Sequence, residues 1–231
     1  LSPQLDLRLT GGRAWRLPNF VADNLSLLAS SKTWIADQAL LPEISWNVGA
    51  SLMQGFSFKK RKGSLSLDAY HTRFSQQLVA DRDTLSGAVV FKNLQNNSLA
   101  TVIQAEFSYA VLKGLDLRLA YKFQDVRALF DGTLQTQVLL PRQRLFANMA
   151  YQTRNKRWNY DLTYSRYSAV RLPQGGQGSP WGLLNAQVTR NWKALELYAG
   201  GENLLNVMQH HPIVGVQDPF GENFDATEIW S

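Results

Sequence analysis

The residues that could carry out chemistry are few in this sequence. It has three histidines, His71, His210 and His211, and no cysteine. The absence of cysteine excludes disulfides, thiol catalysis and cysteine-ligated zinc. Met208, His210 and His211 stand close together in a long connection, where they could contact a metal or haem. Such residues in a loop are more often polar surface, so both interpretations stay open and no metal site is predicted.

Six charged residues fall at alternating positions in segments that have the pattern of strands, so they should share one side of a sheet. They are Asp68, Glu106, Asp116, Arg118, Lys122 and Asp161. Converging acids could form a catalytic set, but no Ser-x-His or paired-aspartate signature accompanies them. The inner side of a membrane barrel carries such residues as a polar wall. We favour the polar wall and predict no catalytic residue.

Three aromatic residues in the connections, Trp34, Trp181 and Phe220, are candidates for stacking on a ligand. Binding residues concentrate in loops that a rigid scaffold positions. The alternative is that these rings pack the connections against one another. Together with Met208, His210 and His211, they form the candidate ligand-binding set, and no cofactor is predicted.

Alternation with period two dominates the segments that must position these residues. Leu115, Leu117 and Leu119 face one way, whereas Asp116 and Arg118 face the other. Many of the segments have 10 or more residues, whereas strands of soluble proteins have about 5–6 and a tilted strand needs about 9–11 to cross a bilayer. The sequence predicts nine strands, at about 3–13, 45–58, 64–77, 100–111, 115–126, 142–153, 157–168, 182–192 and 195–204. In the third, the apolar side changes after Leu67, which suggests a β-bulge.

The connections alternate between short and long without exception. The short ones carry the sequences KKRKG, LKG, RNK and WKA. The long ones are 14–44, 78–99, 127–141, 169–181 and 205 onward. Outer-membrane barrels have short turns on one side and long loops on the other. The sequence therefore predicts an all-β fold, an antiparallel transmembrane β-barrel with short periplasmic turns and long extracellular loops.

The composition agrees with an ordered chain that does not cross a membrane as helices. The 231 residues are 45% hydrophobic and 18% charged, so disorder is excluded. No apolar run approaches the roughly 18 residues of a membrane-spanning helix. The net charge of +6 comes largely from cations in or beside the short turns, such as Lys59, Lys113 and Lys193. Because nucleic-acid binding requires a basic face with stacking aromatics, we expect no nucleic-acid partner.

Three motifs occur in order along the chain. The first comprises Gly11, Gly12, Arg13, Trp15, Pro18 and Asn19. The second comprises Pro42, Glu43, Trp46, Asn47 and Gly49, and the third Asn203, Leu204, Leu205 and Asn206. These motifs resemble segments of TonB-dependent outer-membrane receptors, and the similarity covers residues 1–231 as the C-terminal part of the receptor barrel.

Architecture explains these motifs better than ligand chemistry does. The adjacent glycines Gly11 and Gly12 let a strand bend or another backbone approach. Pro18 cannot donate to a sheet, so strand pairing should end near it. Gly200 and Gly201 should loosen the last strand near its end.

The resemblance implies a barrel of about 22 strands with a plug in its lumen. It implies active uptake of a scarce nutrient, such as a metal chelate, haem, cobalamin or a glycan, across the outer membrane of a Gram-negative bacterium. The implied partners are outer-membrane lipid, an N-terminal plug domain, the TonB energy-coupling complex and, in some members, a surface lipoprotein. The plug would lie upstream of this segment. No chemical step is catalysed in such uptake.

Two other classes of protein have weaker support in the sequence. A ten-stranded outer-membrane hydrolase would need histidine and acids converging at its rim. A soluble β-sandwich would not need every second connection to be long. Because strand nine rises again, residues 205–231 should be an external loop, and a closing strand should begin at or just after residues 228–230. We therefore expect the chain to continue about 15–20 residues past Ser231 with one more alternating segment.

Overall fold

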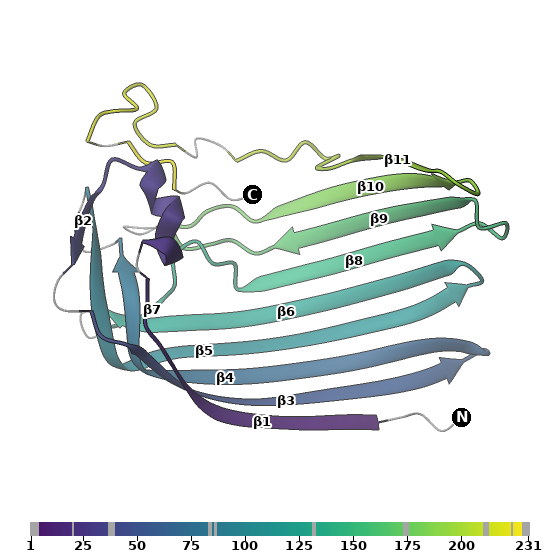
Figure 1. Cartoon of the computed structure of the whole chain (residues 1–231), viewed down its shortest axis with the longest axis horizontal. Helices are drawn as coiled ribbons and strands as arrows, with labels where there is room; N and C mark the ends of the chain where they lie inside the picture. The colour runs from purple at the N-terminus through teal and green to yellow at the C-terminus, as the bar shows by residue number, and fades with distance from the viewer. Residues whose placement is uncertain are drawn as a thin grey trace.

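The protein is a curved sheet of long strands. The computed structural model describes residues 5–19, 21–36, 40–82, 85, 87–130, 133–172, 176–209, 213–222 and 224–227, with only the backbone at 95–97 and 130. Nine strands pair antiparallel in the order β1-β3-β4-β5-β6-β8-β9-β10-β11, with β1 and β11 at the edges (Figure 1). No helix among the described residues is long and apolar enough to cross a membrane.

All nine predicted strands are confirmed. They are β1 Leu5–Arg16, β3 Glu43–Phe58, β4 Arg61–Asp81, β5 Ala88–Leu112, β6 Leu115–Phe130, β8 Gln143–Gln152, β9 Trp158–Tyr167, β10 Trp181–Asn191 and β11 Glu196–Gly201. The antiparallel all-β fold predicted from the alternation is therefore present.

The long connections hold more structure than the sequence suggests. They contain the 3₁₀ helix η1 (Ala22–Ala29) and the short strands β2 (Thr33–Ala36) and β7 (Thr133–Thr136). The predicted connection 78–99 is wrong, because β4 continues to Asp81 and β5 begins at Ala88. Residues 88–91 are buried on both sides, and such a strand loses the alternation that would identify it.

The expected bulge in β4 lies further along the strand than predicted. The pairing of β3 with β4 runs without a shift through Leu67, which faces Leu52. The register between β4 and β5 shifts between Phe74 and Gln76 instead. Polar side chains such as that of His71 already break the alternation before the bulge, so the pattern alone misplaces it.

One face of the sheet is apolar and exposed. The register places Leu7, Leu52 and Leu67 in one cross-strand row, and their exposed fractions are 62%, 37% and 46%. Rows on either side of this one continue the leucine-rich surface over the other strands. A soluble sheet would bury such a face, whereas a membrane barrel presents it to lipid.

The opposite face is polar and internally hydrogen-bonded. Ser51 Oγ donates to Asp68 at 2.5 Å. Arg118 donates through two nitrogens to Glu106 at 2.8 and 2.9 Å, and Asn148 donates to Asp161 at 3.1 Å. The polar wall predicted from the alternating charges is therefore present.

The short turns gather at one end of the sheet, which we call the short-turn end (Figure 1). Gly114 has a φ of +85°, and a Cβ there would lie 2.3 Å from the carbonyl oxygen of Gln152. Only glycine fits this position without strain. Aromatic rings cluster on the apolar face near these turns, as in the stacked pair Phe56 and Phe107 at 5.9 Å. Aromatic side chains therefore gather on the apolar face at the short-turn end.

The other end, which we call the long-connection end, carries a small core. Leu27 of η1 packs against Val89 and Phe91 of β5, with exposed fractions of 5%, 0% and 1%. The segment 213–227 returns to this end and lies beside η1 (Figure 1). Ser31 N donates to Phe224 O at 2.9 Å and Ala226 N to Ala29 O at 2.9 Å. The last long connection is therefore joined to the first.

Candidate functional site

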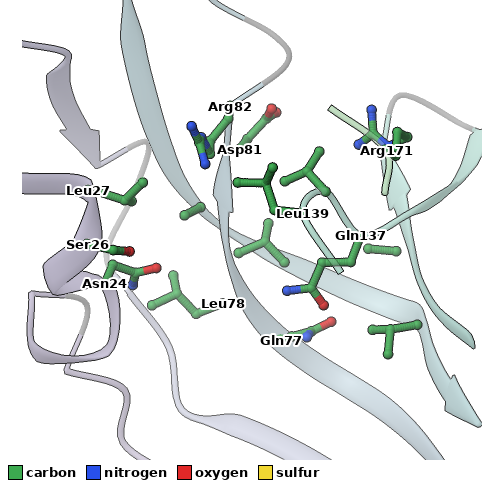
Figure 2. A pocket seen from close by; sticks show the side chains of 15 residues that line it. Asn24, Ser26, Leu27, Gln77, Leu78, Asp81, Arg82, Gln137, Leu139 and Arg171 are labelled. Atoms are coloured by element: carbon green, nitrogen blue, oxygen red, sulfur yellow. The ribbon is translucent and has the colours of Figure 1, made fainter. Parts of the chain in front are cut away.

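A cavity of about 260 Å³ lies at the long-connection end. Figure 2 shows residues of η1 on one side of it and residues of the connection after β7 on the other. Its lining residues are Asn24, Ser26, Leu27, Gln77, Leu78, Val79, Ala80, Asp81, Arg82, Val126, Ala128, Gln137, Val138, Leu139 and Arg171. The last residues of β4 and the end of β6, with Val126 and Ala128, complete the wall.

Packing fixes the wall that η1 contributes. Leu27 is anchored in the core of Val89 and Phe91, and Asn19 Oδ1 accepts a hydrogen bond from Ala22 N at 3.1 Å at the start of the helix. Trp34 of β2 lies against Phe91 with ring centroids 5.1 Å apart. η1 is therefore held in place by apolar contacts and presents Asn24 and Ser26 to the cavity.

Backbone hydrogen bonds fix the opposite wall. Arg171 Nε donates to Thr136 O at 2.8 Å, and Leu139 N donates to Arg171 O at 2.8 Å. Gln137 N donates to Val126 O at 3.0 Å, which ties this connection to β6. The amides and guanidinium at this wall are hydrogen-bonding groups on a preformed frame.

A cluster of charges adjoins the cavity through Arg82, which is one of the lining residues, and we call it the Asp225 cluster (Lys32, Arg82, Asp225 and Thr227). Lys32 Nζ lies 2.5 Å and Arg82 Nη2 3.5 Å from Asp225 Oδ2. Thr227 donates to Asp225 Oδ1 from its backbone N at 2.8 Å and its hydroxyl at 2.5 Å. Arg82 also donates to Thr227 Oγ1. The cluster joins β4 to segments far apart in the sequence.

The electrostatics of this cluster favour the ionised carboxylate of Asp225. The residue is 3% exposed, and burial by itself would raise its pKa. Hydrogen bonds from Lys32 and Thr227, together with the positive charge of Lys32, outweigh burial and lower the pKa below its ordinary value of 3.8. Arg82 Nε is buried and has no hydrogen-bond partner among the described residues.

A second polar feature stands on the polar face near the same end. Tyr167 and Trp181 stack with centroids 4.9 Å apart and planes 11° apart. The guanidinium of Arg144 lies over the Tyr167 ring at 5.0 Å. This stack orders the start of β10, where Trp181 is its first residue.

The candidate ligand-binding residues are dispersed in the structure. Trp34 and Trp181 are engaged with other rings, whereas Met208 and Phe220 are 67% and 98% exposed. Of these four, none lines the cavity. His210 and His211 lie outside the described residues. Among the residues that are described, no group of three or more histidines, cysteines or acids could hold a metal ion.

The first motif makes structural contacts. β1 ends at Arg16, two residues before Pro18, as predicted. Arg16 Nη2 lies 2.7 Å from Glu43 Oε2 and 3.2 Å from Asp23 Oδ2, so it joins β1, β3 and η1. A Cβ added to Gly12 would meet nothing within 4 Å among the described residues. The close backbone approach considered for it is therefore not observed.

The third motif forms a tight turn after β11. Asn203, with a φ of +49°, exchanges hydrogen bonds with Val207 through both atoms of its side-chain amide at 2.9 Å. Its backbone N donates to Asn185 Oδ1 at 2.8 Å, and Leu204 N donates to Leu184 O at 2.7 Å. Asn206 has a φ of +50°. Asparagine suits such left-handed positions.

No pattern in the sequence indicates the residues that line the cavity. Asn24, Gln77 and Gln137 are ordinary polar residues in three separate segments, and only the fold brings them together. The one available signal is at Arg82, a charged residue that follows the apolar residues 78–80 near the end of a long strand. No spacing in the sequence links it to Asp225, its partner in a connection far along the chain.

Comparison with known proteins agrees with this architecture. A family model described as TonB dependent receptor-like, beta-barrel matches residues 1–204. A mutant of the ferric enterobactin receptor PfeA from Pseudomonas aeruginosa aligns at 16% identity and a TM-score of 0.58, covering 88% of this chain and 33% of that one. The copper transporter OprC aligns at 11% identity and a TM-score of 0.59, covering 89% and 32%. A search of curated proteins found no match.

These similarities differ in what they establish. The chain spans about one third of the length of the matched structures. At identities this low, the likeness to the solved structures concerns the fold, whereas the family match covers most of the chain.

Proposed function

Because the chain belongs to the family of TonB-dependent receptor β-barrels, we propose that it forms part of the wall and of the outer mouth of a nutrient transporter. In this proposal, residues 1–231 are the C-terminal part of the barrel domain. The short-turn end faces the periplasm and the long-connection end faces the outside. The whole protein takes up a scarce nutrient across the outer membrane of a Gram-negative bacterium.

The observation that carries the proposal is the contrast between the two faces of the sheet. Leu7, Leu52 and Leu67 form part of an exposed apolar face, and the other face holds ion pairs such as that of Arg118 with Glu106. Strands with these two faces suit a barrel with lipid outside and a polar lumen.

The family is one of receptors and transporters rather than enzymes, so the alternative of a ten-stranded hydrolase finds no support. We infer that the polar face meets an N-terminal plug domain and that TonB acts through that domain. A surface lipoprotein is a further partner of such receptors in this proposal.

We propose that the cavity at the mouth contributes to the ligand site. Its lining combines amides, a hydroxyl and two arginines with apolar residues, a mixture that can orient an oxygen-rich ligand. Metal chelates, haem and cobalamin all remain candidate ligands. The exposed Met208 and Phe220, with Trp34, Trp181, His210 and His211, stay candidate contacts for the part of a ligand above the cavity.

The first test is growth of a deletion strain. We expect a strain that lacks the complete receptor to grow poorly on limiting iron, cobalamin or a glycan, and to recover when the gene is restored. Uptake of the labelled nutrient should also stop when TonB is removed. Normal growth and uptake under all of these conditions would contradict the proposed function.

The second test concerns the cavity itself. Replacement of Gln137 by Ala removes one hydrogen-bonding group from the wall, and we expect ligand affinity to fall about 3–10-fold. Gln135→Ala is the matched control, because Gln135 is in β7, half-buried and outside the lining. Equal affinities of the two variants for the nutrient identified by growth would exclude the cavity as a contact.

A further inference from the structure

Three arginines stand in one cross-strand row on the apolar face. The register pairs Arg13 with Trp46 and Trp46 with Arg73. It then pairs Arg73 with Leu99 and Leu99 with Arg127. Paired residues of neighbouring strands point to the same side of a sheet. We call Arg13, Arg73 and Arg127 the outward arginine row.

This row marks where the apolar face ends. The row two residues nearer the short-turn end contains Val48, His71 and Thr101. The next contains Ala50, Ala69 and Ile103, and the one after it Leu52, Leu67 and Ala105. The face thus changes from aliphatic to cationic within a few residues of each strand. On β9, Arg166 also points outward, but its partner Leu145 pairs with Tyr121, which places it in the row of Leu52, Leu67 and Ala105 rather than in the arginine row.

The distance between the two cationic ends of a strand fits one bilayer. Lys62 lies near the start of β4 and Arg73 in its later part, while Arg157 precedes β9 and Arg166 lies near its end. Each interval matches the roughly 9–11 residues that a tilted strand needs to cross a bilayer. The outward arginine row therefore lies at the level of lipid headgroups if the short turns lie at the other surface.

The row is not neutralised by the protein. Arg13 and Arg73 are exposed and have no ion pair or hydrogen bond among the described residues. Asp125 is the acid at this level, and it is shared by Arg127 at 2.8 Å and Arg142 at 3.1 Å. Arg127 and Arg142 share one carboxylate, and Arg13 and Arg73 have no acidic partner among the described residues. This side of the sheet therefore keeps an excess of positive charge.

We propose that the outward arginine row binds the phosphate groups of anionic lipid headgroups. A guanidinium is planar and binds two phosphate oxygens at once. Trp46 and Leu99, which separate the arginines in the row, would contact the adjoining hydrocarbon region. The inference rests on the membrane location of the proposed function, and it adds a lipid site outside the lumen.

The test is a lipid-binding comparison with the complete receptor in detergent micelles. Bound phosphatidylglycerol and phosphatidylcholine are counted by native mass spectrometry during titration. We expect tighter binding of phosphatidylglycerol, and a loss of about 30-fold in its affinity in the Arg13→Gln, Arg73→Gln double variant, as expected for two surface cations. Arg13→Lys with Arg73→Lys should keep most of the preference.

A matched control removes the same charge from the other face. Arg8 and Lys122 point to the polar face of β1 and β6, since they pair with Ser51 and Arg144. The Arg8→Gln, Lys122→Gln variant should bind phosphatidylglycerol as the unaltered protein does. Equal affinity for the two lipids, or equal effects of the two double variants, would overturn the lipid site. Competition by millimolar inorganic phosphate as effective as that by lipid would assign the row to free phosphate instead.

The same preparation separates this inference from the proposed function. If the receptor stays monodisperse without detergent, the membrane location fails and both proposals fall. If it requires detergent but shows no lipid preference, only the lipid site is overturned. Nutrient uptake by cells that carry the Arg13→Gln, Arg73→Gln variant gives an independent readout, which should stay close to normal.

Discussion

Asp225 joins three segments at the long-connection end, because Lys32, Arg82 and Thr227 all contact its carboxylate. In Asp225→Asn, the buried Arg82 and the largely buried Lys32 lose their counter-charge, which is among the costly changes in a protein. We expect amide hydrogen exchange in 213–227 to become at least about 10-fold faster. Asp218→Asn is the control, since Asp218 is exposed in the same connection. Unchanged exchange in both variants would show that the cluster does not hold the segment.

Protonation of Asp225 should also make the stability of the long-connection end depend on pH. The pKa of Asp225 in the folded protein is lower than its ordinary value of 3.8. The ionised cluster therefore stabilises the fold fully above that value, and its contribution is lost as the pH falls through the lowered pKa. We expect the segment 213–227 to become protease-sensitive below about pH 4 while the strands stay protected. Asp225→Asn should abolish this pH dependence, and a variant that kept it would refute the assignment.

Gly114 is the single residue on which one short turn depends. Its φ is +85°, and a Cβ would collide with the backbone of Gln152. Gly114→Ala should lower the free energy of unfolding by about 2 kcal/mol or more, measured by urea titration in detergent. Gly12→Ala is the control, because a Cβ there meets nothing within 4 Å. A Gly12 variant as unstable as the Gly114 variant would contradict this explanation.

At the scale of elements, η1 depends on one side chain. Leu27 is 5% exposed and packs in the small core, whereas the adjacent Leu28 is 60% exposed. Leu27→Ala should lower the local stability of η1 by about 2–3 kcal/mol and weaken ligand binding at the cavity. Leu28→Ala should do neither. Hydrogen exchange of residues 22–29 measures the first effect and a ligand titration the second.

The nine long strands were predictable because each carries its own alternation. The elements at the long-connection end were not, for two physical reasons. β2 and β7 have four residues each, which is too short for a periodic pattern to stand out. The start of β5 is buried on both sides, so no polar residue alternates with Val89 and Phe91. The cavity was beyond sequence reasoning, since Asn24 and Gln137 meet only through these elements.

At the scale of the whole molecule, a charge introduced on the apolar face of the sheet should destabilise the protein in a bilayer, whereas the same charge on the polar face should not. Leu67 faces outward in the leucine-rich row, and Ser66 faces the polar side of the same strand. Leu67→Arg should reduce the free energy of unfolding in lipid bilayers by about 2–4 kcal/mol. Ser66→Arg should change it little. Equal effects would mean that Leu67 does not face lipid.

The pairing of Ser30 with Asp225 has a consequence for the order of assembly. Contacts between positions so distant in the chain pay the largest loop-closure entropy, and they form late. The sheet can grow strand by strand through hairpins, but this contact needs both flanks of the sheet in place. We expect the cavity to appear last during refolding into lipid, after the strands are protected. Ligand binding would then distinguish completely inserted receptors from incomplete ones, because only the complete receptors have the cavity.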